Sequence, residues 1–483
     1  MTRFQAIVIG AGPGGICSGI RLRESGCDDF VILEKASGLG GTWYHNRYPG
    51  AACDVPSHLY SFSFATRLDW PRPYSPQPEI LTYLQDVAER HDLARHLRFD
   101  TEVRRAEWIE ERALWRVQTA NGEALEAPVL LSAMGMFNEL HVPEIPGLEE
   151  FAGTRFHSAR WPQGHDLIGE RVGVIGSAAS AVQLVPKVAR DATQLDLYQR
   201  TANWVLPKDD TPYRQDELDA FRDDPSQADE VRRKIYGDVE LLLTYDDEAS
   251  LAAADRAGRE ALLVVENPET RRALEPQHPY GCKRPLLSND YYPTFNRDNV
   301  ALITDPIDHV TAEGVVTRNG RLRAVDTLIL ATGFDTTRFL SAIEVIGRDG
   351  IRLEERWRDG AYAFLGSMIP GFPNLFMMYG PNTNNGSIIE MIEHQVDFAM
   401  RQIERLGAED LATIEPSPQA TTSYNEHLQS EIDSVEVWQA DCFGYYRGPT
   451  GRIVTQWPHN MGAYERQMRD APASAFVVSP RRA

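Results

Sequence analysis

Two stretches of this chain repeat one pattern, in which a short apolar strand runs into a turn of glycine and alanine and then into a helix. The turn of the first copy lies at residues 10–15, and the turn of the second lies at residues 176–181. Each copy continues to a further apolar strand, at residues 30–33 and 195–198. A strand, a helix and a second strand form the β-α-β unit from which parallel sheets are built. The sequence therefore predicts an α/β fold that contains two such modules.

The first turn has the spacing Gly-x-Gly-x-x-Gly between a strand and a helix. Its first glycine makes the tight turn, its second lets a pyrophosphate approach the backbone, and its third lets helix and strand pack closely. The carboxylate of Glu34, which closes the second strand, suits hydrogen bonds to a ribose diol. This first site predicts FAD or NAD without a 2′-phosphate, with contacts from Gly10, Gly12, Gly14, Gly15, Glu34 and Lys35.

The second turn departs from this spacing. Ala178 takes the place of the middle glycine and Ala181 that of the third, so a methyl group at 178 is expected to loosen the grip on a pyrophosphate. Arg200 follows the second strand where an acid would stand, and a guanidinium fork can grip phosphate with two hydrogen bonds. This arginine favours NADPH, although a plain surface arginine is the alternative interpretation. Together the turns predict two Rossmann-type dinucleotide-binding domains.

Longer motifs resemble one enzyme family. Residues 151–162, FAGTRFHSARWP, match the F-x-G-x-x-x-H-x-x-x-W-P fingerprint of type I Baeyer–Villiger monooxygenases, which are class B flavoprotein monooxygenases. Residues 40–54, GGTWYHNRYPGAACD, resemble the flavin-contacting loop of that family. Segments 199–204, 281–285 and 331–335 are similar to family segments in the family's order. The polar loop that begins GPNTNNG and the C-terminal region resemble a shorter branch related to aryl-ketone oxidisers.

The resemblance implies an NADPH-dependent flavoprotein monooxygenase that holds FAD and NADPH. Such enzymes use O₂ to insert one oxygen atom next to a ketone carbonyl, through a C4a-peroxyflavin, and give an ester or lactone. Arg284 takes the position of the family's active-site arginine, whose permanent charge can stabilise a peroxide and a developing alkoxide. Asp54 matches the loop aspartate that would hold this arginine and contact the nicotinamide. Without the surrounding motif, Asp54 would be interpreted as an acid that caps a turn.

The same resemblance implies further cofactor contacts and two organising residues. His157 and Trp161 of the fingerprint are expected to organise domain movement rather than to carry acid–base chemistry. Tyr445 is expected to replace a family tryptophan near the nicotinamide ribose. The expected FAD contacts are Gly41, Thr42, Trp43, Asp54, Tyr60 and Val103, and the expected NADPH contacts are Gly176, Ser177, Ala179, Ser180, Gln183, Arg200, Thr201, Lys283 and Tyr445.

The pattern of elements predicts a domain division. Residues 1–145 form the first part of an FAD-binding domain, residues 146–330 an NADP-binding domain, and residues 331–483 the second part of the first domain. An acidic, helical insertion at about 209–276 interrupts the NADP-binding domain. Residues 103–131 alternate apolar and polar side chains around Asn-Gly, which predicts hairpin strands inserted in the first module.

Composition narrows the partners. Acidic residues outnumber basic ones, 70 against 49, for a formal net charge of −21. Such a field repels nucleic acid and anionic membranes, so neither is an expected partner. The family resemblance implies a small-molecule ketone and O₂ as the partners. With no apolar run long enough to span a bilayer, no basic-apolar leader and five scattered cysteines, we expect a cytoplasmic protein. The sequence leaves the oligomeric state open.

Three other functions fit part of the pattern. A flavin monooxygenase that oxygenates sulfur or nitrogen would keep both cofactors. A pyridine-nucleotide disulfide reductase would need a redox cysteine pair, but the residues five positions either side of Cys53 are Tyr48 and His58. A non-catalytic nucleotide sensor would keep the glycine turns without needing Asp54 and Arg284 together.

Overall fold

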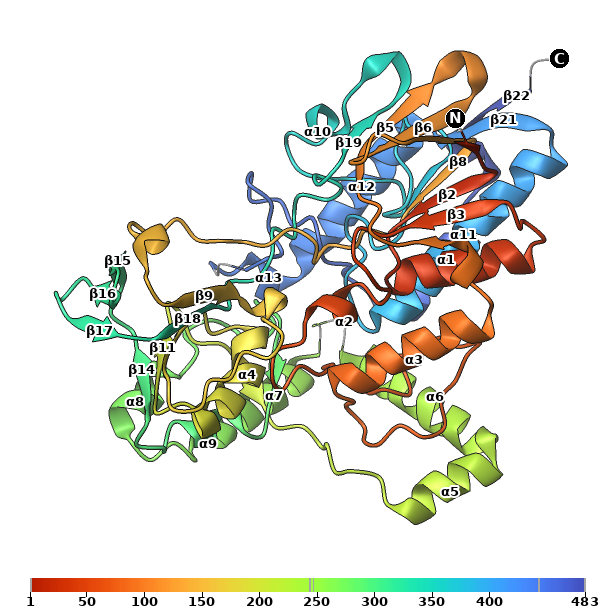
Figure 1. Cartoon of the computed structure of the whole chain (residues 1–483). Coiled ribbons are helices and arrows are strands. Elements are labelled where there is room, and N and C mark those ends of the chain that lie inside the picture. The colour runs from red at the N-terminus through yellow and green to blue at the C-terminus, as the bar shows by residue number, and fades with distance from the viewer. Residues whose placement is uncertain (1, 243–244, 246, 442–443, 482–483) are drawn as a thin grey trace.

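The computed structural model describes residues 2–242, 245, 247–441 and 444–481 (Figure 1). A parallel sheet forms the first module, with strand order β20-β8-β2-β3-β4. Its strands are β2 (Ala6–Ile9), β3 (Phe30–Leu33), β4 (Leu97–Arg98), β8 (Val129–Ser132) and β20 (Leu375–Met377).

Alternating side chains of β2 explain how this sheet is covered on both faces. Ala6 and Val8 belong to a core formed with α1 (Pro13–Glu24), α3 (Gln77–Arg90) and α11 (Ile388–Ala408). Ile7 and Ile9 point the other way and pack against a mixed sheet of order β1-β7-β6-β5-β19, in which β5, β6 and β7 run antiparallel and the two edge strands pair in parallel. The strands of that sheet are β1 (Thr2–Arg3), β5 (Val103–Ile109), β6 (Leu114–Thr119), β7 (Ala124–Ala127) and β19 (Glu344–Ile346).

The expected hairpin strands at 103–131 are found for most of that range. Strands β5, β6 and β7 run antiparallel, and the turn between β6 and β7 holds Gly122 at φ 86°. The expectation was wrong for the last segment, because Val129–Ser132 pairs in parallel with β2 and β20 in the first sheet. Its four side chains are all buried, as expected for a central strand of a parallel sheet. Because the strand has no exposed polar face, its sequence pattern does not show to which sheet it belongs.

The second module is another parallel sheet, of order β14-β11-β10-β18-β9 (Figure 1, yellow and green). Helix α4 (Ala179–Asp191) packs on it through a core that includes Val182 and Val185. The strands are β9 (Thr154–His157), β10 (Arg171–Ile175), β11 (Gln194–Tyr198), β14 (Val300–Ile303) and β18 (Thr327–Leu330), and a small antiparallel sheet follows β14 as β15 (Ile307–Thr311), β16 (Gly314–Thr317) and β17 (Leu322–Ala324).

Helices fill the expected insertion between β11 and β14. They are α5 (Gln215–Asp223), α6 (Pro225–Leu242), α7 (Glu248–Leu262) and α8 (Pro268–Ala273). Figure 1 draws α5 and α6 away from the second sheet, on the side of the molecule that holds α3. A short parallel pair, β12 (Val205–Leu206) with β13 (Leu286–Leu287), brings the chain back to the second module, where α9 (Tyr291–Thr294) packs on α4.

The C-terminal part adds helices and one antiparallel pair of strands to the first module. After α10 (Leu353–Arg356), β20 and α11 come β21 (Leu411–Pro416), α12 (Pro418–Ser434), α13 (Glu436–Gln439), α14 (Met461–Arg469) and β22 (Phe476–Pro480). Strands β21 and β22 pair antiparallel beside α11. Within the ranges that the structure describes, a helix with the length and apolar character needed to cross a membrane is absent.

Candidate active site

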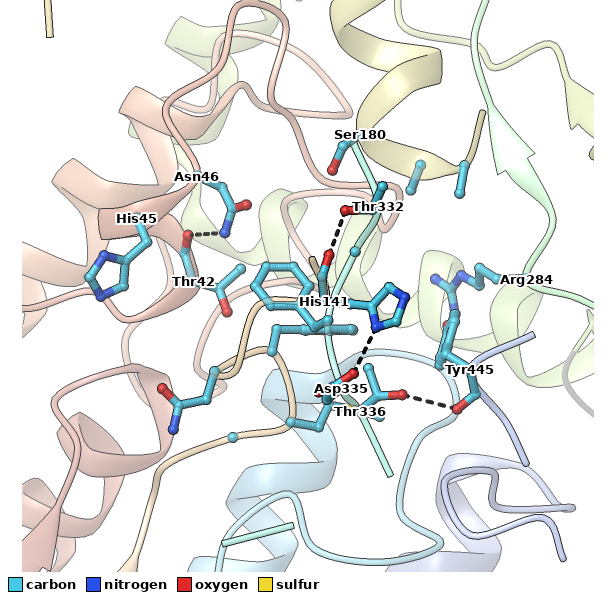
Figure 2. A pocket seen from close by; sticks show the side chains of 18 of the residues that line it. Thr42, His45, Asn46, His141, Ser180, Arg284, Thr332, Asp335, Thr336 and Tyr445 are labelled. Carbon is cyan, nitrogen blue, oxygen red and sulfur yellow. Dashed lines mark hydrogen bonds and ion pairs between the residues drawn. The ribbon is translucent and has the colours of Figure 1, made fainter. Parts of the chain in front are cut away.

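A cavity of about 1150 Å³ lies where the carboxyl ends of the two parallel sheets meet. Ligands of open parallel sheets bind at this edge. The sequence-predicted residues converge on it from both modules (Figure 2). Those that line it are Gly10, Gly12, Gly14, Glu34, Lys35, Gly41, Thr42, Trp43, Asp54, Tyr60, Val103, Gly176, Ser177, Ala179, Ser180, Gln183, Arg200, Thr201, Lys283, Arg284 and Tyr445.

Gly15 does not line the cavity, because it sits behind the first turn. A Cβ at Gly15 would lie 1.8 Å from the carbonyl oxygen of Gly10, so α1 can pack this close to the turn only with glycine there. Gly10 has φ 101°, and its Cβ would lie 2.6 Å from the carbonyl oxygen of Ala133. Gly41 brings a second loop against Gly12, since its Cβ would lie 2.9 Å from the Gly12 Cα. The three glycine roles expected from the spacing fit this geometry.

Glu34 stands at the mouth of the first turn and is 6% exposed. Its Oε2 accepts a hydrogen bond from the Ala11 amide at 2.8 Å, and its Oε1 accepts one from the Ala36 amide at 2.8 Å. These donors fix the carboxylate, while each oxygen keeps a lone pair that a ribose hydroxyl could use. Lys35 donates to Asn138 at 2.6 Å and stays at the rim.

The second turn tolerates its alanines. Gly176 has φ 108° and a Cβ there would lie 2.3 Å from the carbonyl oxygen of Ala331, so this glycine is required. Ala178 is the N-cap of α4 at φ −89° and ψ −161°, close to the φ −77° and ψ −170° of Gly12 at the N-cap of α1. Any residue can adopt that backbone conformation, so an alanine there adds no backbone strain.

Cations gather beside the second turn. Lys283 donates to the Thr201 hydroxyl at 3.0 Å, and the Ser177 hydroxyl donates to the Thr201 carbonyl at 3.1 Å. Burial lowers the pKa of Lys283, and the nearby charge of Arg200 lowers it further. Neither cation has a carboxylate partner among the described residues. A dianionic phosphate between them would relieve that repulsion, as the expected 2′-phosphate contact requires.

Gln183, an expected cofactor contact, lines the cavity and also makes hydrogen bonds between the two modules. The Tyr48 hydroxyl donates to Gln183 Oε1 at 2.8 Å, and Gln183 Nε2 donates to the Ala52 carbonyl at 2.8 Å. A Cβ at Gly50 would lie 2.5 Å from the Gln183 carbonyl oxygen, so the loop is pressed directly onto α4. The amide therefore joins the two modules while it borders the cavity, and the sequence spacing contains no sign of this contact.

Asp54 and Arg284 meet across the two modules. Arg284 donates from Nη2 and Nε to the same carboxylate oxygen of Asp54, at 2.9 and 3.1 Å. The Asp54 carboxylate raises the pKa of Arg284 well above its usual value, in opposition to the effect of burial. The guanidinium therefore stays charged at the wall of the cavity, where its side chain is half-buried and a fixed charge acts more strongly than in bulk water.

The loop and helix around residue 43 form an aromatic wall. Trp43 lies in α2 (Thr42–His45) and its indole N–H donates to the Tyr60 hydroxyl at 3.1 Å. The two rings meet edge to face, with centroids 5.7 Å apart. Burial raises the pKa of Tyr60, so this hydroxyl stays neutral. Val103, at the start of β5, borders the same region.

Comparison with known proteins shows to which family this chain belongs. A family model described as pyridine nucleotide-disulphide oxidoreductase matches residues 7–222. The Baeyer-Villiger monooxygenase of Streptomyces coelicolor is 38% identical over 98% of this chain and 92% of its own, and that of Pseudomonas aeruginosa is 39% identical over 98% and 91%. This chain belongs to the Baeyer–Villiger monooxygenase family.

Solved structures agree with this membership. Cyclohexanone monooxygenase from Rhodococcus sp. Phi1 bound to NADP⁺ has a TM-score of 0.90 at 33% identity, over 99% of this chain and 100% of that chain. An oxidised steroid monooxygenase bound to NADP has a TM-score of 0.89 at 33% identity, over 99% and 100%. This Baeyer–Villiger monooxygenase thus has the fold expected from its motifs.

A disulfide reductase function finds no support at the loop cysteine of this family member. Cys53 carries a free thiol and is buried. Burial and the neighbouring Asp54 raise the pKa of the Cys53 thiol, which disfavours the thiolate that disulfide exchange needs.

His157 of the fingerprint connects β9 to the segment that leaves the second module. Its Nε2–H donates to the Gly333 carbonyl at 3.0 Å, and its Nδ1 accepts from the Ala159 amide at 3.1 Å. Burial lowers the pKa of His157, so the neutral ring is favoured. Trp161 packs edge to face on Phe156, with centroids 4.9 Å apart. These contacts fit an organising role.

Further polar residues line the cavity that were not among the expected site residues. The Tyr379 hydroxyl donates to Asn384 Oδ1 at 2.8 Å, and Asn384 Nδ2 donates to Gln456 at 2.5 Å. His141 pairs with Asp335 at 3.0 Å (Figure 2). The polar GPNTNNG loop was a signal for Asn384, whereas His141 stands in no motif.

Tyr445 lines the same cavity. Its backbone carbonyl accepts a hydrogen bond from the Thr336 hydroxyl at 3.1 Å, and Figure 2 shows its side chain beside Arg284. Its ring centroid lies 6.3 Å from that of Phe137 and 5.0 Å from that of Tyr446.

Proposed function

We propose that this family member uses NADPH, FAD and O₂ to insert one oxygen atom next to the carbonyl carbon of a small-molecule ketone, which gives an ester or lactone. The observation that carries the proposal is the ion pair between Asp54 and Arg284, because it places a permanent positive charge between the two nucleotide turns. A nucleotide-binding protein without chemistry would not need this half-buried charge at the wall of the cavity.

The residues around each turn fit the two cofactors. The first turn, with the Glu34 carboxylate, suits FAD, which has a free ribose diol. The second turn, with Arg200 and Lys283, suits the 2′-phosphate of NADPH. A solved structure of OTEMO in complex with FAD and NADP, 28% identical to this chain, supports the same pair. When bound, NADPH supplies the reducing equivalents and FAD the means of activating O₂.

Arg284 and Asp54 have different roles in the proposed reaction. The Arg284 guanidinium stabilises the negative charge that develops on the ketone oxygen as the carbonyl carbon is attacked. One such donor in an enclosed site is worth about 3 kcal/mol in the transition state. Asp54 holds the fork in orientation and prevents the guanidinium from turning to solvent. No residue is required to lose a proton for this part of the reaction.

The domain division is part of the same proposal. We place the boundaries at residues 145 and 330, because every strand of the second sheet lies between Thr154 and Leu330. Membership of β20 in the first sheet supports assigning residues 331–483 to the first domain.

Product analysis with ¹⁸O₂ tests the function. The purified enzyme is incubated with NADPH and a panel of aryl, cyclic and linear ketones, together with thioethers of similar size. We expect esters or lactones that carry one ¹⁸O atom. Sulfoxides without any ester would favour the alternative, a flavin monooxygenase that oxygenates sulfur or nitrogen, and would reject ketone oxidation.

A further inference from the structure

Arg232, in the inserted helix α6, reaches out of the second module into the loop that carries Tyr60. Its Nη1 donates to the backbone carbonyls of His58 and Ser61, at 2.8 and 2.9 Å, and lies 3.3 Å from that of Leu59. Its Nη2 bonds the Glu390 carboxylate of α11. One guanidinium therefore holds the carbonyls on both sides of Tyr60 and ties them to the helix behind them.

The burial of this contact makes it energetically important. The side chains of Arg232 and Glu390 are 12% and 14% exposed. Carbonyls and a carboxylate that are this well shielded cannot replace their donor with bulk water at low cost. The Ser387 hydroxyl adds a donor to the Leu59 carbonyl at 3.1 Å, so the loop depends on two neighbours for its shape.

A second part of the insertion covers the same loop. The rings of Tyr213 and Phe221 meet the His58 ring edge on, with centroids 5.7 and 5.3 Å away. The Tyr213 amide donates to the Pro71 carbonyl at 3.0 Å. Farther along α6, Glu240 accepts a hydrogen bond from the Met461 amide at 2.6 Å, at the N-terminus of α14. Helix α6 is thus fastened to the first module along its length, although the chain enters it from the second.

The loop leads directly to the flavin side of the cavity. Tyr60 lines the cavity and its hydroxyl accepts the indole N–H of Trp43 at 3.1 Å. Displacement of the 58–61 backbone would move the Tyr60 ring and release Trp43. We propose that Arg232 is a positioning residue for the flavin site, so that a helix inserted in the NADP module completes the FAD module. This inference rests on the proposed function, which places FAD at the first turn.

Arg232→Met in the full-length enzyme tests the proposal. We expect the dissociation constant for FAD to rise by about tenfold or more, because the loop loses a charged donor shared by its carbonyls. At saturating FAD, the KM for NADPH is expected to change less than about twofold, since the second turn is untouched. Arg232→Lys keeps the charge but lacks the fork, so it should recover only part of the affinity. Arg233→Met, an exposed neighbour in α6, serves as the matched control and should leave FAD binding unchanged.

The outcomes separate this proposal from the proposed function. An unchanged FAD dissociation constant in Arg232→Met would overturn the positioning role while wild-type turnover still supports the function. Equal weakening of FAD and NADPH binding would also overturn it, because that pattern indicates general destabilisation. A wild-type protein that binds no FAD would remove the proposed function itself. If Arg232→Met does not fold, Arg232→Lys is judged by the same criterion, and an unaltered FAD dissociation constant overturns the role.

Discussion

Replacing Gly176 with alanine should disable the second nucleotide turn and leave the first intact. Gly176 has φ 108°, and the new Cβ would lie 2.3 Å from the Ala331 carbonyl oxygen, about 0.7 Å inside the 3.0 Å limit of real Cβ contacts. The positive φ alone costs about 1–2 kcal/mol for a residue with a Cβ. Relief of the contact must in addition move the turn away from the strand end at Ala331, because the Cβ is held rigidly by its own backbone and meets a backbone carbonyl.

Such a displacement acts directly on cofactor binding. The amide groups at the start of α4 are aligned for a pyrophosphate by the turn that precedes them. A misplacement near 1 Å in an oriented site can cost about 100-fold, so we expect the KM for NADPH to rise by about 10- to 100-fold. FAD content should stay at the wild-type level. Gly10→Ala, with φ 101° and a Cβ 2.6 Å from the Ala133 carbonyl oxygen, should do the reverse and yield protein depleted of FAD.

Two controls separate the contact from the backbone penalty. Gly122 has φ 86°, and a Cβ there would have nothing within 4 Å. Gly122→Ala therefore introduces the strain of a positive φ without a steric clash. Its stability should fall while both cofactors bind normally. Ala178→Gly relieves no backbone strain, because Ala178 has an ordinary backbone conformation, so tighter NADPH binding by this variant would report the expected hindrance by the Ala178 methyl group. The assay is steady-state NADPH oxidation at saturating ketone, with FAD measured by absorbance. A Gly176→Ala enzyme with wild-type KM for NADPH would refute the assignment of the second turn.

Three further predictions concern single charges. Arg284→Ala should still permit flavin reduction by NADPH in stopped-flow measurements but abolish ester formation, and an undiminished ester yield would disprove its role. Arg200→Met and Lys283→Met should each raise the KM for NADPH by about tenfold or more while leaving that for NADH nearly unchanged, and a parallel rise for both nucleotides would argue against 2′-phosphate recognition. Burial raises the pKa of Glu393 from 4.5 to about 7, so the folded state binds more protons than the unfolded state between these pH values. The free energy of unfolding should therefore lose about 3 kcal/mol as pH rises through that window. Glu393→Gln should flatten this slope in denaturant titrations, and an equal slope in both proteins would contradict the shift.

The sequence predicts those features of the fold and the site that depend on neighbouring residues or on a family motif. The glycines at 10, 15 and 176 stand where backbone geometry leaves room for no side chain, so spacing alone is enough to find them. The Asp54–Arg284 pair follows from the family resemblance and could not follow from spacing, because 230 residues separate its members. Strand Val129–Ser132 was assigned to the wrong sheet because a fully buried strand has no polar face that reports its partner. Gln183 lies in a predicted cofactor segment, but its side-chain amide is also hydrogen-bonded to Tyr48. This tertiary contact produces no periodic pattern in the sequence and could not be predicted from it.

Each module builds its own nucleotide turn, yet the groups assigned to the chemistry stand at the boundary between modules. Tyr48 and Ala51 are buried in the core of the second module, whereas Trp43 before them and Cys53 after them are buried in the core of the first. Asp54 follows directly, so its carboxylate is placed by both cores at once. Its partner Arg284 comes from the second module. A shift of one module against the other therefore cannot leave this ion pair unchanged, whereas either glycine turn could survive it.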